Sequence, residues 1–221
     1  AIPKYHAHGI FLVIDVTASR RRTDANVAFT WFGRFGMALG LALGVYIYPY
    51  WSFTCVVYVC AVFGIGALLL IPLLHIPFRA PLCPPLFSLD RFLLPRTLLP
   101  GINMLLVSFI FGVIIAHIYN EIFYICILIG FAVSLLISKY ALSHTSCRAE
   151  MEFGQAALVA GILLMAFSNS LMSSYIAALL LGIGIGITAS RFFVIMISLP
   201  LHCERGTGNN TYQLLWEVGL L

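Results

Sequence analysis

The chain has 221 residues, of which 62% are hydrophobic and only 9% are charged, and its mean hydropathy is +1.03. A soluble domain carries roughly 25% charged residues, so this composition excludes an ordinary water-soluble protein. The formal net charge of +4 could suggest a nucleic-acid partner. We expect none, because the basic residues are distributed as they are in membrane proteins.

Apolar runs long enough to cross a bilayer follow one another along the chain, since a spanning helix needs ~20 mostly apolar residues. Six such runs fall near 26–48, 53–74, 101–119, 122–138, 154–171 and 174–199. A seventh opens at about 207, and the chain stops inside it at Leu221. We therefore expect a polytopic all-α membrane protein that is a fragment of a longer chain, truncated at both ends. Residues 1–16 fit this pattern least well.

Most of the twelve Lys and Arg residues lie in one alternating set of loops, around 20–25, 75–100, 139–153 and 200–206. They are Arg20, Arg21, Arg22, Arg79, Arg91, Arg96, Lys139, Arg148 and Arg205. By the positive-inside rule these loops face the cytoplasm. We predict a multi-pass protein of the plasma (inner) membrane. The six cysteines are scattered, so we expect neither a disulfide framework nor a metal site.

The stretch 75–100 is the longest without an apolar run, and it is rich in proline. These prolines keep either flanking helix from continuing through the stretch. We therefore predict three parts. Residues 1–74 form the end of an N-terminal helical bundle, 75–100 form a cytoplasmic central linker, and 101–221 form a truncated C-terminal bundle.

An internal repeat relates the basic loop before the first span to the loop before the last. Both follow the pattern R-x3-N-x2-[FY]-x4-[RE]-x-G, with Arg22, Asn26, Phe29, Arg34 and Gly36 matching Arg205, Asn209, Tyr212, Glu217 and Gly219. Both copies are predicted on one side of the membrane, so the repeat is parallel. Two six-helix halves, related by an axis along the membrane normal, form a known transporter architecture.

With this topology the sequence resembles the major facilitator superfamily, with the spans as its fifth to tenth helices and the opening of the eleventh. Arg20–Asn26 looks like the basic loop before the fifth helix, and Arg205–Tyr212 with Trp216–Gly219 looks like the entry to the eleventh. The resemblance implies a secondary active transporter that moves a small solute by alternating access within the lipid bilayer. The chain shows no phosphate-binding loop, so we expect a proton or other coupling ion as the energy source, and no cofactor.

One face of the helix over 26–48 carries Gly33, Gly36, Gly40 and Gly44, which fall within an arc of about 80°. Such a face lets another backbone approach closely. It is also similar to the glycine-rich motif of the family's antiporters, although Leu41 stands where that motif has proline. This glycine-rich face has two interpretations. It could serve only tight helix packing, or it could take part in the conformational change of an antiporter, for example an efflux transporter.

Two arginines lie inside predicted spans, where a charge costs on the order of 3 kcal/mol unless it finds water or a partner. Arg34 either snorkels to the nearby basic loop or takes part in the conformational change. Arg191 lies deeper, with Thr188 one turn before it. The family's tenth helix lines the central cavity, so the resemblance makes Arg191 the first candidate for substrate binding or gating. The alternative is an arginine at the membrane interface.

Three further residues are candidates for the substrate or proton pathway. Glu217 lies inside the last apolar run, where its carboxylate could take up a proton or pair with a helix outside this chain. Asn103 and His117 lie about 40° apart in helical projection, so both could line one cavity. His117 is close to the outer end of its span, where a solvated interfacial histidine is the alternative.

Gly182, Gly184 and Gly186 lie inside an apolar span with no strand before them, so we predict helix packing there rather than nucleotide binding.

Two other functions are compatible with this topology: a membrane enzyme acting on lipid-linked substrates, and a transporter-like sensor that does not transport. An enzyme of that kind usually clusters acids or histidines at the membrane surface. The acids of the predicted cytoplasmic loops are scattered at Asp90, Glu150, Glu152 and Glu204, so we predict no catalytic residue.

Overall fold

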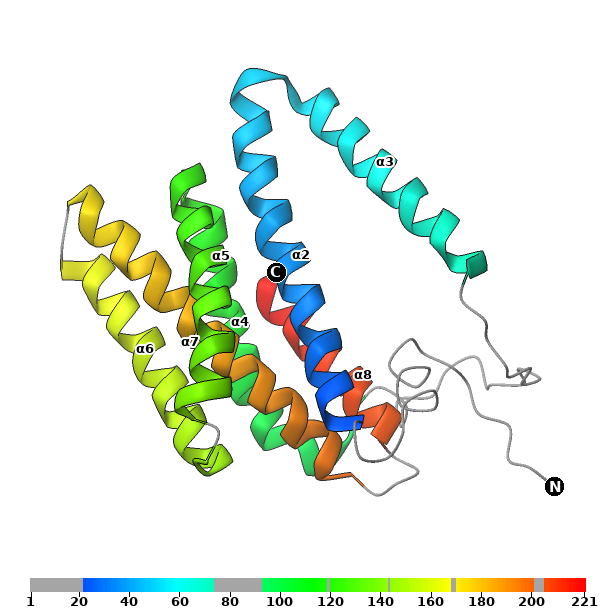
Figure 1. The fold of residues 1–221 in the computed structure, drawn as a ribbon, viewed down its shortest axis with the longest axis vertical. Helices are drawn as coiled ribbons and strands as arrows, with labels where there is room; N and C mark the ends of the chain where they lie inside the picture. Colours follow the sequence, from blue (N-terminus) through cyan, green and yellow to red (C-terminus); the bar gives the residue numbers. More distant parts are fainter. Residues whose placement is uncertain (1–21, 74–92, 119, 143, 168–169, 201–204) are drawn as a thin grey trace.

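The computed structural model describes residues 22–73, 93–118, 120–142, 144–167, 170–200 and 205–221. Every regular element in these ranges is helical: α2 (Arg22–Tyr50), α3 (Phe53–Leu70), η2 (Ile71–Leu73), η4 (Pro95–Thr97), α4 (Leu98–His117), α5 (Glu121–Leu136), the π-helical turn η5 (Ile137–Ala141), α6 (Cys147–Phe167), α7 (Leu171–Ser198) and α8 (Arg205–Leu220). Figure 1 shows α2 and α4 to α8 gathered into one bundle, from which α3 diverges.

Six helices in the described ranges are long and apolar enough to cross a membrane. The prediction of an all-helical, multi-pass membrane protein is confirmed at this level, and so is the count of six complete spans. The predicted segment 1–16 and the first part of the predicted linker lie outside the described residues. So do four arginines of the predicted basic loops, namely Arg20, Arg21, Arg79 and Arg91.

The loop predicted at 139–153 is shorter in the structure, because α6 begins at Cys147. Ser146 starts this helix: its Oγ accepts a hydrogen bond from the N–H of Ala149 at 3.3 Å, and its carbonyl accepts one from the N–H of Glu150 at 3.2 Å. The charges of Glu150 and Glu152 lower the hydropathy of the first turn. For that reason the apolar run was predicted to begin only at 154.

Helix α7 lies at the centre of the bundle, where it packs against α2, α4, α5, α6 and α8. In the most apolar 18-residue stretch of α7, 72% is buried, compared with 0% in the corresponding stretch of α3. Its glycines make this possible. A Cβ atom on Gly182 would lie 3.0 Å from the Cα of Gly130 on α5, and one on Gly184 would lie 2.8 Å from the carbonyl oxygen of Gly154 on α6. The packing role predicted for the α7 glycines is therefore confirmed.

Helix α2 packs against α5 through one face, on which Trp31, Ala38 and Ala42 are buried. Its glycine-rich face lies elsewhere on the helix. A Cβ atom at any of the four positions predicted for close packing, Gly33, Gly36, Gly40 and Gly44, would meet no described atom within 4 Å. Helix α3 has no buried residue and is apolar on every side, as suits a helix surrounded by lipid.

The end of the predicted linker is fixed to α8 by one hydrogen bond and braced by a second within the linker. The N–H of Leu94 donates to Oγ1 of Thr211 at 3.1 Å, and Oγ1 of Thr97 donates to the carbonyl of Leu94 at 2.9 Å. Leu94, Thr97 and Thr211 are all buried. Thr211 thus holds the segment that precedes α4 against α8.

Replacing Thr211 with valine should release this segment. The substitution keeps the shape of the side chain but leaves the buried N–H of Leu94 without an acceptor, which costs about 1–3 kcal/mol. We expect faster amide hydrogen exchange at residues 94–97 than in the parent protein. Thr145→Val is the control, because Oγ1 of Thr145 is exposed and bonds only to the nearby carbonyl of Leu142. Unchanged exchange at 94–97 in Thr211→Val would contradict the anchoring role.

Candidate functional site: a buried ion pair between α6 and α7

Helices α6 and α7 contact each other through faces that combine small residues with two charges. The buried residues of α6 recur at helical spacing at Glu150, Gly154, Ala157, Leu158 and Gly161. On α7 the facing positions include Gly184, Thr188 and Arg191. The small residues let the two backbones approach closely, so the charges at one end of the contact are brought together.

The guanidinium of Arg191 donates through Nε and Nη2 to one carboxylate oxygen, Oε2, of Glu150. Glu150 lies in the first turn of α6, and Arg191 lies about two turns before the end of α7. The side chain of Glu150 is 4% exposed and that of Arg191 is 28% exposed. The carboxylate is therefore sealed inside the bundle, whereas the guanidinium remains partly accessible.

Burial makes this pair energetically sensitive. Each charge alone would be costly inside the bundle, and removing one partner of a buried pair typically destabilises a protein by about 3–5 kcal/mol. Arg191 is the one residue among Leu171–Ser198 that carries a full charge at neutral pH. Glu150 therefore has a single cationic partner available from α7.

Thr188 adds a hydroxyl to the same contact. It lies one turn before Arg191, is fully buried, and packs against Gly154 of α6. Its Oγ1 has no hydrogen-bond partner among the described residues. An unsatisfied buried hydroxyl costs about 1–3 kcal/mol. Glu150, Arg191 and Thr188 thus form a polar strip, hereafter the α6–α7 polar strip, whose buried hydroxyl has no hydrogen-bond partner among the described residues.

A second ion pair nearby provides a contrast. Arg148 and Glu152 are one turn apart on α6, with Nε and Oε1 at 2.8 Å, and their side chains are 85% and 63% exposed. Exposed pairs at this spacing contribute only about 0.3–0.5 kcal/mol. The two pairs share residue types and location but differ in burial, so Arg148 and Glu152 form a matched control for Arg191 and Glu150.

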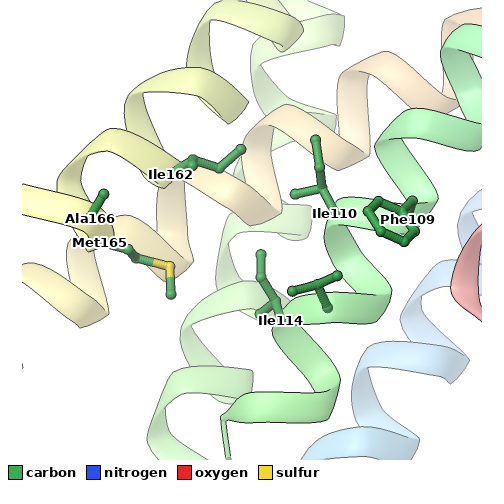
Figure 2. Close-up of a pocket in the computed structure, with 7 residues that line it drawn as sticks. Phe109, Ile110, Ile114, Ile162, Met165 and Ala166 are labelled. Carbon is green, nitrogen blue, oxygen red and sulfur yellow. The ribbon is translucent and has the colours of Figure 1, made fainter.

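A hollow between α4 and α6 lies toward the other end of the bundle. It has a volume of about 400 Å³ and is lined by Phe109, Ile110, Val113, Ile114, Ile162, Met165 and Ala166. Figure 2 shows Ile162 and Met165 of α6 facing the α4 isoleucines. Ile162 lies about 18 Å along α6 from Glu150. No polar side chain lines this pocket, so its side-chain lining is entirely apolar.

The other predicted site residues are not gathered around the ion pair. Asn103 and His117 both lie exposed on α4, and Nδ1 of His117 is 2.9 Å from the carbonyl oxygen of Val113 on its own helix. Glu217 is exposed on α8, and no described residue forms an ion pair with it. Arg34 belongs to α2, and its side chain is outside the described part of the structure.

Sequence reasoning singled out Arg191 but missed its partner, because Glu150 was counted among scattered surface acids. The sequence did contain a signal that points to Glu150. Gly154 and Gly161 mark the small-residue face of α6, and continuing that face one turn toward the start of the helix leads to Glu150. The same step on α7, from Gly184 through Thr188, leads to Arg191.

The sequence matches no known protein-family model, and it shows no significant similarity to a curated protein or to a solved structure.

Proposed function

We propose that this chain belongs to a secondary active transporter that moves a small solute by alternating access, with a proton as the coupling ion. The observation that carries the proposal is the ion pair of Glu150 and Arg191, buried between two membrane-competent helices. Ionisable groups inside spans are costly, and they mark substrate, ion or proton pathways. Glu150 can take up a proton, whereas an arginine does not release one in proteins.

Protonation of Glu150 would change the contact between α6 and α7. The neutral carboxylic acid no longer attracts the guanidinium as a counter-ion, so Arg191 becomes available to another partner. A proton gradient can therefore act on the α6–α7 polar strip, provided that the strip is accessible in turn from the two sides of the membrane. In this proposal Arg191 serves substrate binding or gating, and Glu150 is the proton acceptor.

The arrangement of α2 supports the alternating movement. This helix precedes the predicted linker, yet it packs against α5, which follows the linker. Parts of both proposed halves thus share one contact, as two bundles that rock about a common site require. Helices α2 and α8 also begin at the aligned residues Arg22 and Arg205. Both features support the proposed major facilitator architecture, with these spans as its fifth to eleventh helices.

The proposal predicts proton movement that depends on a solute and on the buried pair. The protein is reconstituted in liposomes containing a pH-sensitive dye, and a panel of drugs, sugars and small acids is added outside. We expect Glu150→Gln and Arg191→Ala to lower the solute-dependent flux more than about tenfold, equivalent to about 1.4 kcal/mol. The double variant Arg148→Gln/Glu152→Gln should keep the parent flux. Glu217→Gln tests the proton acceptor predicted on α8.

The direction of proton movement distinguishes the two transport modes, since an antiporter releases protons against solute entry and a symporter carries them inward. Absence of flux with every solute, from a folded protein, would contradict the proposal and favour the enzyme or the sensor. Equal loss of flux in the Arg148 and Glu152 control would show that the effect is not specific to the buried pair.

A further inference from the structure

The turn between α2 and α3 carries a cluster of exposed aromatic side chains. Helix α2 ends at Tyr50 and α3 begins at Phe53, so only Trp51 and Ser52 connect them. Ser52 has a φ of 72°, and this left-handed backbone helps to reverse the chain within the short turn. Five aromatic residues here are each more than half exposed and are hereafter the aromatic turn: Tyr46, Tyr48, Tyr50, Trp51 and Phe53.

The backbone of this turn is unsuited to the hydrocarbon core of a membrane. The last carbonyl groups of a helix and the first N–H groups of the next have no partner within their own helices, and hydrocarbon supplies none. Two amides are bonded locally, since the N–H of Trp51 donates to the carbonyl of Ile47 at 3.0 Å and that of Cys55 donates to the carbonyl of Ser52 at 3.2 Å. The other backbone groups at these helix ends need water or lipid headgroups.

The side chains of the turn suit a headgroup layer better than bulk water. Residues 35–73 contain no Asp, Glu, Lys or Arg. Tyrosine and tryptophan combine an apolar ring with a polar tip, and both are enriched where a membrane meets water. The rings of Tyr46 and Tyr50 have centroids 5.6 Å apart and form one continuous surface. This surface continues into α3, which has no buried residue and diverges from the bundle (Figure 1).

The lengths of the two helices agree with this position of the turn. The apolar stretches Trp31–Tyr50 and Phe53–Leu70 have 20 and 18 residues. They correspond to about 30 Å and about 27 Å along a helix axis, and the hydrocarbon core is about 30 Å thick. With the turn at one boundary of the core, both stretches therefore reach the other boundary. The rest of α2, residues 22–30, then extends beyond the core, and its sequence carries Arg22 and Asp24.

We propose that the aromatic turn is an interfacial anchor that binds the phospholipid headgroup layer of the bilayer. Tyr48, Tyr50 and Trp51 pack their rings against the first segments of the acyl chains, and their hydroxyl and indole N–H groups bond to headgroup oxygens and water. The contact fixes the depth at which α2 ends and α3 begins. This inference is independent of the transport proposal, because it rests on the turn and not on the buried pair.

The test measures the depth of Trp51 by fluorescence quenching. The full chain is reconstituted in phosphatidylcholine vesicles whose lipid carries bromine either near the glycerol or near the end of the acyl chain. The chain has three tryptophans, so the emission of Trp51 is taken as the difference between the parent and Trp51→Phe. We expect the shallow bromine to quench this emission several-fold more strongly than the deep bromine does, because the indole lies at the boundary of the core.

Phe63→Trp, made in the Trp51→Phe protein, is the matched control. Phe63 is exposed like Trp51, but it lies about 15 Å along the axis from the start of α3, near the middle of the core. Its tryptophan should show the opposite order, with stronger quenching by the deep bromine. All these positions are exposed, so the substitutions leave the packed part of the bundle unchanged.

A further variant, Tyr48→Leu/Tyr50→Leu, tests the chemistry of the anchor. Without the two hydroxyl groups the turn should sink toward the hydrocarbon, so quenching of Trp51 by the deep bromine should increase. Unchanged quenching in this variant would overturn the role of the tyrosines.

Three results with the parent would overturn the anchor itself. Strongest quenching by the deep bromine would place the turn inside the hydrocarbon core. Strongest quenching by iodide in the water would place it in bulk solvent. Quenching by none of these agents would show that another protein segment, or a second copy of the chain, covers Trp51.

Discussion

Replacing Arg191 with methionine is expected to destabilise the bundle by about 3 kcal/mol or more, because it leaves Glu150 buried without its counter-ion. Adding Glu150→Leu should recover much of this loss, since buried ion pairs replaced together by apolar side chains are often neutral or stabilising. The measurement is a double-mutant cycle of unfolding free energies. Unfolding is monitored by circular dichroism in mixed micelles as the fraction of denaturing detergent is increased. A strongly unfavourable effect of the single variant and a mild effect of the double variant would establish coupling.

The exposed pair provides the comparison for this cycle. Arg148→Met and Glu152→Leu, separately or together, should change the unfolding free energy by less than about 0.5 kcal/mol. Equal effects for the exposed and buried pairs would contradict the structure. So would additive single effects at Arg191 and Glu150, because residues in one ionic contact should be coupled.

Alanine at Gly130 or Gly182 should force α5 and α7 apart. A Cβ atom on Gly130 would lie 2.5 Å from the carbonyl oxygen of Leu179 and 2.9 Å from the Cα of Gly182, so it would press on backbone rather than on a movable side chain. Inserting a methyl group into such a contact costs typically about 1–3 kcal/mol, and backbone neighbours place the expected value at the upper end. Unfolding in mixed micelles measures the loss.

Gly40→Ala in α2 is the matched control for this prediction. A Cβ atom at Gly40 would meet no described atom within 4 Å, and alanine is a better helix former than glycine by about 1 kcal/mol. The variant should therefore be neutral or slightly stabilising. If Gly40→Ala proved as harmful as Gly182→Ala, another helix would have to cover the glycine-rich face of α2.

Much of the fold could be predicted because membrane spans depend on composition within one segment. The apolar runs identified the six membrane-competent helices of the described residues, and the predicted start of the fourth run, 122, is within one residue of α5. The start of α6 was predicted too late. Hydropathy treats the charges of Glu150 and Glu152 as solvated, whereas the structure compensates one through Arg191 and the other through Arg148.

The candidate site was less predictable, since a projection of one helix tells which residues share a face but not what that face meets. Arg191 was identified because a lone charge in an apolar helix needs a partner. Glu217 was selected by the same reasoning, and Asn103 and His117 were selected because they share one face of their helix, but all three lie on exposed surfaces in the described part of the structure. The partner helix decides whether a polar residue forms a site, and that choice is made by tertiary packing.

The bond between Leu94 and Thr211 has a consequence for biogenesis. The two residues are 117 positions apart in the chain. At synthesis rates of 5–20 residues per second, Thr211 follows Leu94 by roughly 6–23 s. During that interval α4 to α7 enter the membrane before the N–H of Leu94 has its acceptor. Helix α8 therefore completes this contact only after α4 to α7 have been synthesised, and ribosomal stalling before Thr211 would leave the N–H of Leu94 without its acceptor in the membrane-inserted intermediate.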